Sequence, residues 1–242
     1  HGGAGSWMHW IRNIEALSAR HTVWALDMPG YGDSAPPHPL SVDAIADTIE
    51  RGLRALIPGE QPVDLVAFSF GAAIATMIAV RLEHRLRNLV LLGARFAQFS
   101  SRPRLSLVKW RGIEDPASRL AAHRSNLGML MIANSVNIDA LAVQVQSNSE
   151  RARISPRRWK PHAADRLHEN FPLVRPRGRV ATVFGSLDSG AHSIVENGGS
   201  QLRAIRPDLD YRVVENAGHW IQYEAAGAVN ATLLDILRAS TR

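Results

Sequence analysis

The sequence predicts an α/β protein built on a mostly parallel, doubly wound sheet with a helical insertion. Short apolar segments typical of buried strands alternate with segments of helical periodicity. One of these strands runs directly into a serine and an apolar helix, and the alternation stops after Ala94 and resumes near Arg179. At 242 residues, 45% of them hydrophobic, the chain is long enough for one sizeable core with an insertion.

The first part of the chain alternates between helices and strands. Apolar residues at helical spacing between Trp7 and Ala19 predict a helix, and Ser41 is a typical N-cap for the next one. The turn from Asp27 to Ser34 is dense in glycine, proline and aspartate, and we interpret it as architectural. We therefore expect helices over residues 7–19, 42–57 and 70–84, and strands over residues 22–28, 63–68 and 86–93.

The chain beyond Ala94 first becomes helical and then returns to the alternation. Residues 120–131 and 138–147 carry apolar side chains at spacings of three and four, with Asn137 as an N-cap. Strands are expected over residues 180–184 and 211–214, and a last helix over residues 226–238. We assign residues 1–94 and 179–242 to one α/β core and residues 95–178 to a helical cap.

The strand that runs into Ser69 predicts a nucleophile elbow, a strained turn between a strand and a helix. Residues two positions before and after the serine of such a turn must be small, and here they are Ala67 and Gly71. The turn places Ser69 at a helix N-terminus, where the Phe70 N–H can stabilise an oxyanion. The alternative is a buried structural serine at a strand-to-helix junction.

The glycine-rich start of the chain, from His1 to Gly5, predicts a loop that supplies a second oxyanion donor. Glycine lets the backbone N–H groups of such a loop approach a substrate oxygen closely. We expect the second donor to be Gly3 or, failing that, Ala4.

Two strands near the end of the chain are each followed by a residue suited to acid–base chemistry. Asp188 comes shortly after one strand and His219 shortly after the next. Because the carboxyl ends of parallel strands meet at one edge of a sheet, both can converge on Ser69. A serine hydroxyl becomes a strong nucleophile when an imidazole accepts its proton and a carboxylate holds that imidazole. The alternatives are a turn-forming aspartate and a surface-loop histidine.

Four motifs in this order make the whole chain resemble the α/β-hydrolase fold superfamily, in its serine hydrolase branch. They are the opening His1-Gly2-Gly3, the turn at 27–34, the elbow at Ser69 and the run Gly218-His219-Trp220. The triad of this superfamily follows the order Ser, acid, His. The resemblance therefore implies that Ser69 attacks, His219 carries the proton and Asp188 orients it.

The same resemblance implies that N-terminal strands of the fold are missing before His1. In the superfamily, strands precede the glycine-rich loop, so we expect a fragment of a longer chain or a gene model that starts too late. If the natural chain starts at His1, the sheet exposes an edge that should be paired, and we expect poor solubility.

The motifs are similar to those of two groups within the serine hydrolase branch. The run from Gly218 to Glu224, with Asn230, and the run Arg12-Asn13-Ile14 are similar to hydrolases that cleave carbon–carbon bonds in meta-cleavage products of aromatic rings. Their Gly-Pro-Gly loop is absent, and the elbow has Ala67 and Ala72 where they usually have glycine. We therefore predict hydrolysis of a carboxylic ester or lactone of a small molecule, with carbon–carbon hydrolysis as the alternative. A non-catalytic ligand-binding protein is the alternative from another class, because fold alone does not settle function.

The expected cap is strongly basic. Residues 95–179 hold 16 arginines and lysines against 6 aspartates and glutamates, whereas the whole chain holds 28 against 22. One interpretation is that the cap binds an anionic substrate, because arginine pairs bidentately with carboxylates. The candidate substrate contacts are Arg151, Arg153, Arg157, Arg158 and Trp220. The alternative is a solvated basic face, since these arginines are spread out.

The composition and motifs exclude several kinds of partner. With no cysteine, the chain has no disulfide framework, thiolate nucleophile or cysteine metal site. The histidines show no metal-ligand spacing, and we expect neither a metal nor a cofactor. No recognition helix or aromatic–basic pattern indicates nucleic-acid binding, and no apolar run is long enough for a membrane span. We expect a small-molecule substrate and, from the lack of cysteine and of a signal peptide, a cytoplasmic location.

Overall fold

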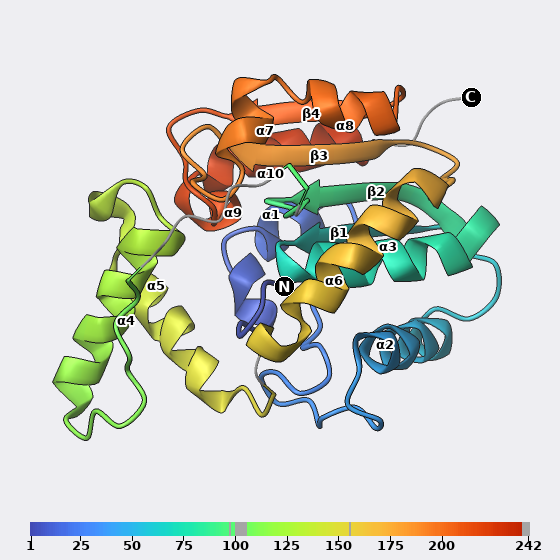
Figure 1. Cartoon of the computed structure of the whole chain (residues 1–242). Helices are drawn as coiled ribbons and strands as arrows, with labels where there is room; N and C mark the ends of the chain where they lie inside the picture. The colour runs from blue at the N-terminus through green and yellow to red at the C-terminus, as the bar shows by residue number, and fades with distance from the viewer. Residues whose placement is uncertain (97, 100–105, 155, 239–242) are drawn as a thin grey trace.

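Four parallel strands form the centre of the molecule (Figure 1). The computed structural model describes residues 1–96, 98–99, 106–154 and 156–238, with the backbone alone for Glu83 and residues 156–161. In these residues the strands are β1 (Val63–Phe68), β2 (Leu86–Leu92), β3 (Val180–Gly185) and β4 (Asp210–Val214), side by side in that order. Parallel neighbours require crossover connections, and helices supply them. The predicted α/β class is confirmed.

Helices connect the strands and cover them. The α-helices are α1 (Ile14–Ser18), α2 (Val42–Leu56), α3 (Phe70–Leu82), α4 (Pro116–Leu130), α5 (Ala140–Ser147), α6 (Pro156–Asn170), α7 (His192–Glu196), α8 (Ser200–Ile205), α9 (Ile221–Glu224) and α10 (Ala226–Ile236). Short 3-10 turns are η1 (Trp7–Trp10), η2 (Glu83–Arg85), η3 (Ser135–Asn137), η4 (Asn148–Arg151) and η5 (Phe171–Leu173). Ser41 caps α2 as predicted, because its hydroxyl accepts the Ala44 N–H at 3.0 Å.

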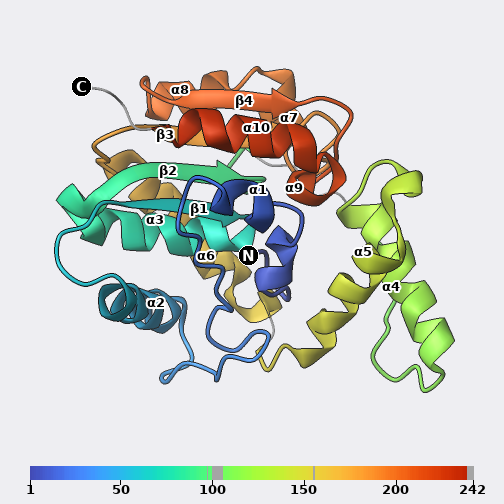
Figure 2. The same ribbon diagram turned by 180° about the vertical axis from the view of Figure 1, so that it is seen from behind.

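The sheet carries helices on both faces. α3 and α6 lie in front of it in Figure 1, and α1 and α10 lie in front of it in the reverse view of Figure 2. Because both faces are covered, strands can be continuous apolar runs, and every residue of β3 is buried. α3 is buried over nearly its whole length because it packs against β1 and also against α2 and α6. The core therefore consists of two apolar clusters, one on each face of the sheet.

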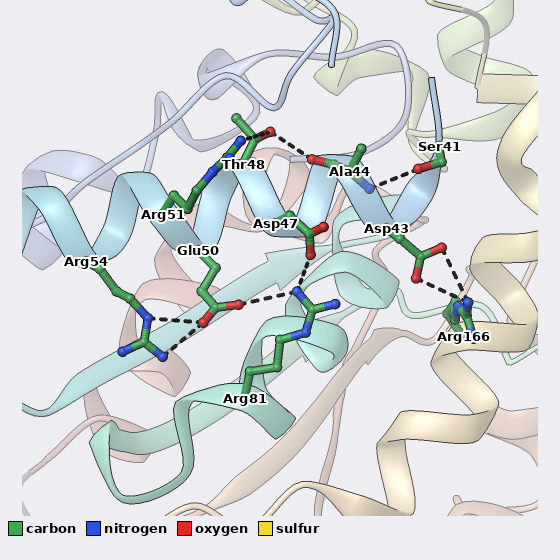
Figure 3. A network of polar contacts seen from close by, with 10 residues as sticks. All are labelled: Ser41, Asp43, Ala44, Asp47, Thr48, Glu50, Arg51, Arg54, Arg81 and Arg166. Carbon is green, nitrogen blue, oxygen red and sulfur yellow. Dashed lines mark hydrogen bonds and ion pairs between the residues drawn. The ribbon is translucent and has the colours of Figure 1, made fainter. Parts of the chain in front are cut away.

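Helix α2 is joined to its neighbours by arginines (Figure 3). Arg81 of α3 pairs with Asp47 and also with Glu50, whose carboxylate lies 3.3 Å from the guanidinium. Arg166 of α6 pairs with Asp43 at 3.1 Å. Exposed ion pairs contribute only about 0–1 kcal/mol each, so the buried apolar side of α2 carries most of its attachment.

The predicted cap segment, residues 95–178, contains two kinds of helix. α4 and α5 pack on each other outside the layers, on the side toward which the arrowheads of β2 and β4 point (Figure 2). α6 instead packs against α3. Its buried Ala163 and Leu167 join the apolar cluster that contains α3. The part of the segment that stands outside the layers therefore ends before α6.

The first predicted helix and one predicted helix N-cap differ from what the structure shows. The helix expected over residues 7–19 is divided into η1 and α1, and the chain turns between them. The buried amide of Asn13 in that turn donates to the Gln222 carbonyl at 3.0 Å, a long-range bond that apolar periodicity does not reveal. The N-cap of α5 is Asp139, which accepts the Ala142 N–H at 2.8 Å, rather than Asn137.

Residues 22–28 are not a strand, although the sequence predicts one. A strand is defined by backbone hydrogen bonds to a neighbour, and in the part of the chain that the structure describes no strand pairs with these residues. Trp24 and Leu26, two of the apolar residues that indicated a buried strand, are 54% and 44% exposed, whereas Val23 is half-buried against one of the apolar clusters.

Candidate active site

Three of the predicted site residues meet beyond the carboxyl ends of the strands. Ser69 lies between β1 and α3, Asp188 follows β3, and His219 follows β4. Nε2 of His219 lies 2.9 Å from the Ser69 hydroxyl, and Nδ1 lies 2.7 Å from Oδ2 of Asp188. Asp188 and His219 are buried and Ser69 is half-buried. The result is a continuous hydrogen-bonded chain from the hydroxyl to the carboxylate.

The backbone at Ser69 is strained in the way that an elbow requires. Its φ of 53° lies in the left-handed region, which residues other than glycine rarely adopt. The Ser69 N–H donates to the Leu92 carbonyl at 2.9 Å, which ties the turn to β2. Gly71 must be small, because a Cβ there would lie 2.6 Å from the backbone oxygen of His1. The methyl group of Ala67 is accommodated in a buried position.

The ring of His219 lies against the residue that follows β2. Gly93 follows β2 with a φ of 54°, and a Cβ on it would lie 3.0 Å from atoms of the His219 ring. Phe68 packs against the same ring, with centroids 4.9 Å apart. Nothing in its own neighbourhood of the sequence singles out Gly93. The one sequence signal that could have marked Gly93 as a site residue is its position just after a strand, at the edge of the sheet where the carboxyl ends of the strands meet.

The Asp188 carboxylate is engaged at both oxygens. Oδ2 faces His219, and Oδ1 accepts the Gly190 N–H at 2.8 Å. Burial raises the pKa of Asp188, but the charge and hydrogen bond of His219, the charge of Arg95 and the Gly190 N–H outweigh it. The pKa therefore lies below its usual value. An ionised Asp188 can hold a proton on Nδ1 of His219 and orient the ring.

The glycine-rich loop lies against the elbow. The Gly2 N–H in this loop donates to Nδ1 of His9 at 3.0 Å. Within the described residues, no acceptor is recorded for the N–H groups of Gly3 and Phe70, the two predicted oxyanion donors. Ala4, the alternative donor, adopts a left-handed φ of 64°. In the described part of the chain neither predicted N–H group is thus committed to another acceptor.

His9 is a residue of this region that sequence reasoning missed. Its side chain is buried and packs against Phe68 and Trp220, with ring centroids 5.5 and 5.0 Å apart. Burial is the main cause that lowers the pKa of His9 to about 3. The ring is therefore neutral near pH 7, and because Nδ1 accepts the Gly2 N–H, its proton is on Nε2. A polar residue just after the glycine-rich loop was the available signal.

Trp220, predicted to contact the substrate, is fully buried. Its indole N–H donates to the His9 carbonyl at 3.0 Å, and its ring stacks on Tyr223 with centroids 4.2 Å apart. Contact with a substrate would require the indole to leave this position.

Of the four arginines predicted to contact the substrate, two lie beside the turn at 27–34, and the side chains of the other two are outside the part of the chain that the structure describes. Arg151 is exposed and pairs with Asp33. Arg153 is also exposed, and its backbone N–H donates to the Gly30 carbonyl at 2.9 Å. The two remaining candidates, Arg157 and Arg158, are in α6, and their side chains lie outside the described residues.

Two kinds of feature are absent from the described part of the chain. Over residues 1–96, 98–99, 106–154 and 156–238, apart from the side chains of Glu83 and residues 156–161, no three histidine, aspartate or glutamate side chains are grouped to hold a metal ion. Within the same ranges, no helix combines the length and apolar character needed to cross a membrane.

Known proteins match this chain over most of its length. The family model described as alpha/beta hydrolase fold matches residues 1–226. The 2-hydroxy-6-oxononadienedioate/2-hydroxy-6-oxononatrienedioate hydrolase of Paraburkholderia phymatum is 26% identical over 254 aligned positions, which cover 97% of this chain and 83% of that protein.

Two further relatives align over a part of the chain. The 2-hydroxy-6-oxo-2,4-heptadienoate hydrolase of Pseudomonas putida is 37% identical over 94 residues, which cover 38% of this chain and 33% of that protein. The pimeloyl-[acyl-carrier protein] methyl ester esterase of Vibrio campbellii is 28% identical over 114 residues, which cover 47% of this chain and 40% of that protein. Each alignment spans less than half of the relative.

A solved structure with the same architecture is the carboxylesterase CesB (YbfK) of Bacillus subtilis. It superposes with a TM-score of 0.73 at 19% identity, over 99% of this chain and 82% of that chain. At this level of identity the likeness shows the fold alone.

Proposed function

Because the chain belongs to the alpha/beta hydrolase fold family, we propose that it is a serine hydrolase that cleaves a carboxylic ester or lactone of a small molecule. The observation that carries this proposal is the hydrogen-bonded chain from Ser69 through His219 to Asp188. The left-handed φ at Ser69 supports it, because strained backbone concentrates at functional sites.

The first half of the proposed reaction forms an acyl-enzyme. Oγ of Ser69 attacks the carbonyl carbon of the ester while Nε2 of His219 takes its proton, and Asp188 stabilises the resulting imidazolium. The N–H groups of Gly3 and Phe70 bind the oxyanion of the tetrahedral intermediate. When the intermediate collapses, the carbon–oxygen bond of the ester breaks and His219 gives the proton to the leaving alcohol.

The second half releases the acid. His219 takes a proton from a water molecule, whose oxygen attacks the acyl carbon, and the bond to Ser69 breaks with return of the proton to Oγ. An ester yields an alcohol and a carboxylic acid. A lactone yields one hydroxy acid, because its alcohol and acyl groups belong to the same molecule.

A fluorophosphonate probe tests whether Ser69 is activated, without knowledge of the substrate. We expect peptide mapping to place the label on Ser69, and we expect the label to be lost in Ser69→Ala and in His219→Ala. Ser186→Ala is the matched control, because Ser186 also follows a strand but its hydroxyl accepts the Asn216 N–H at 2.9 Å. Labelling of Ser69→Ala at the wild-type level contradicts the proposal. A folded wild-type protein that takes no label favours the non-catalytic ligand-binding alternative.

A carbon–carbon hydrolase of meta-cleavage-type diketo acids is the second candidate. The names of the Paraburkholderia phymatum and Pseudomonas putida relatives support it. Diketo acids are anionic, and the positive charge of Arg95 acts close to Asp188. Turnover of a neutral aryl ester and of a vinylogous diketo acid by the same preparation separates the candidates. Faster turnover of the diketo acid would replace the ester assignment.

The basic balance of residues 95–179 supports an anionic substrate for either reaction. In this proposal Arg153 and the other predicted arginines attract the substrate carboxylate. The lack of cysteine supports a reducing compartment, so we propose a cytoplasmic location, which cell fractionation tests.

A further inference from the structure

Glu224, the last residue of α9, joins the His219 loop to the connection between α4 and α5. Its Oε2 accepts the N–H groups of Gly218 at 2.7 Å and of Ala133 at 3.0 Å, and its Oε1 accepts that of Asn134 at 2.7 Å. Bonds from N–H groups to an ionised carboxylate are stronger than bonds between neutral groups. One side chain therefore binds two backbone segments that are far apart in the sequence.

The residue after His219 is bonded to the same connection. The Trp220 N–H donates to the Met131 carbonyl at 2.7 Å. The residue before His219 fits closely beneath the connection, because a Cβ on Gly218 would lie 2.8 Å from the backbone nitrogen of Ala133. His219 is thus held from both sides by a segment that joins α4 to α5.

Tyr223 attaches α9 to the other end of this connection. Its hydroxyl donates to Oδ1 of Asp139 at 2.5 Å, and Asp139 is the N-cap of α5. Arg12 pairs with Asp139 at 2.5 Å and lies 3.9 Å above the Tyr223 ring. The short helix after His219 therefore contacts both ends of the connection between α4 and α5.

We propose that Glu224 is a positioning residue, which fixes His219 relative to Ser69 by binding the His219 loop to the connection between α4 and α5. This inference rests on the proposed hydrolase function. The recorded bonds of Glu224 go to backbone N–H groups, so its effect on the reaction passes through the loop. A displacement of about 1 Å between reacting groups can lower a rate on the order of 100-fold. In this proposal, α4 and α5 not only lie beside the candidate active site but also hold the His219 side chain in position through their connection.

Two variants of Glu224 test this role kinetically. Glu224→Ala removes both acceptor oxygens and all three hydrogen bonds, whereas Glu224→Gln keeps the shape and one acceptor oxygen. We expect the rate of fluorophosphonate labelling and kcat on an ester to fall by about 10- to 100-fold in Glu224→Ala, with KM within about twofold, and to fall less in Glu224→Gln. Glu169→Ala is the control, since Glu169 is an exposed helical glutamate with one arginine partner, and it should keep the wild-type rate.

Amide hydrogen exchange tests the same contacts without any activity. In Glu224→Ala, exchange of the Gly218, Ala133 and Asn134 amides should rise together by about tenfold or more, while exchange in α10 stays at the wild-type rate. Unchanged exchange at these three amides would overturn the attachment, and faster exchange with unchanged labelling would overturn the positioning role. If the wild-type protein takes no label, the hydrolase proposal fails by itself, and the exchange result decides the attachment alone.

Discussion

The loops at the carboxyl ends of the strands hold their side chains in place, whereas the arginine-rich segment after α5 leaves its described side chains near the surface. Asp188 and His219 are 2% and 3% exposed, and both belong to the hydrogen-bonded chain that ends at Ser69. Arg151 is exposed, and its partner is the exposed Asp33. The register of the parallel strands fixes where each strand-end loop begins and so positions its side chains. By contrast, solvent and salt screen the attraction within a surface ion pair, so such a pair fixes its side chains weakly. Substitutions should therefore have large effects in the first region and small effects in the second.

The largest effect is expected where the hydrogen-bonded chain is cut at its buried end. Asp188→Asn keeps the shape of the side chain but removes the charge that stabilises the imidazolium, so kcat/KM should fall by roughly 10²- to 10⁴-fold. Steady-state kinetics on an ester that the wild type turns over measures this. Asp165→Asn, at an exposed position in α6, should keep the wild-type value. A fall of less than about tenfold in Asp188→Asn would break the contrast between the two regions.

A smaller effect is expected from a methyl group beneath the His219 ring. Gly93→Ala should lower the free energy of unfolding by about 1–2 kcal/mol because of its left-handed φ, and it should slow fluorophosphonate labelling by about tenfold because it moves the ring. Gly198→Ala is a matched control, since Gly198 has a φ of 55° and no atom lies within 4 Å of its Cβ position. It should lose similar stability, measured by urea unfolding, with no change in labelling. Equal labelling rates in the two variants would show that Gly93 does not support His219.

The buried His9 should make the protein less stable in acid. Its pKa is lowered to about 3 from an ordinary value of 6.5, so between these pH values the unfolded chain binds a proton that the folded chain does not. The free energy of unfolding should therefore fall as the pH falls from 6.5 toward 3, by up to about 1.4 kcal/mol per pH unit from this group. His9→Gln keeps an acceptor for the Gly2 N–H but cannot titrate, so its slope should be shallower.

Urea unfolding at several pH values between 7 and 4 measures these slopes. The exposed His162 provides the comparison, because His162→Gln should keep the wild-type slope. If His9→Gln and the wild type lose stability equally in acid, His9 is not held neutral in the folded protein.

The smallest effects are expected in the arginine-rich segment. Arg153→Gln should raise KM for an anionic ester by about two- to fivefold and leave KM for a neutral ester unchanged, because an exposed charge contributes about 0–1 kcal/mol. Arg151→Gln should raise it less, since Arg151 already pairs with Asp33. Equal changes in KM for the anionic and the neutral ester would argue against attraction of a substrate carboxylate.

Most elements of the sheet could be predicted from the sequence, because each strand is an apolar run bounded by polar residues or turns. The elbow strand and the strand before Asp188 begin where they were expected. Residues 22–28 show the limit of this reasoning, since an apolar run becomes a strand only beside a partner. α6 shows a second limit. The expected cap has a helical pattern, but no helix was predicted over residues 156–170, and the packing of α6 against α3 is decided by the three-dimensional arrangement.

The sequence by itself determined where the four strands of the sheet lie along the chain and the candidacy of Ser69, Asp188 and His219. These depend on local residue types and on the rule that parallel strands end at one edge of a sheet. Only the tertiary structure decided how the three side chains are held. The contacts of His9 with Trp220 and of Glu224 with the α4–α5 connection join residues far apart in the chain. Such bonds leave no periodic pattern in a sequence, because each depends on two backbones that become neighbours only when the chain folds.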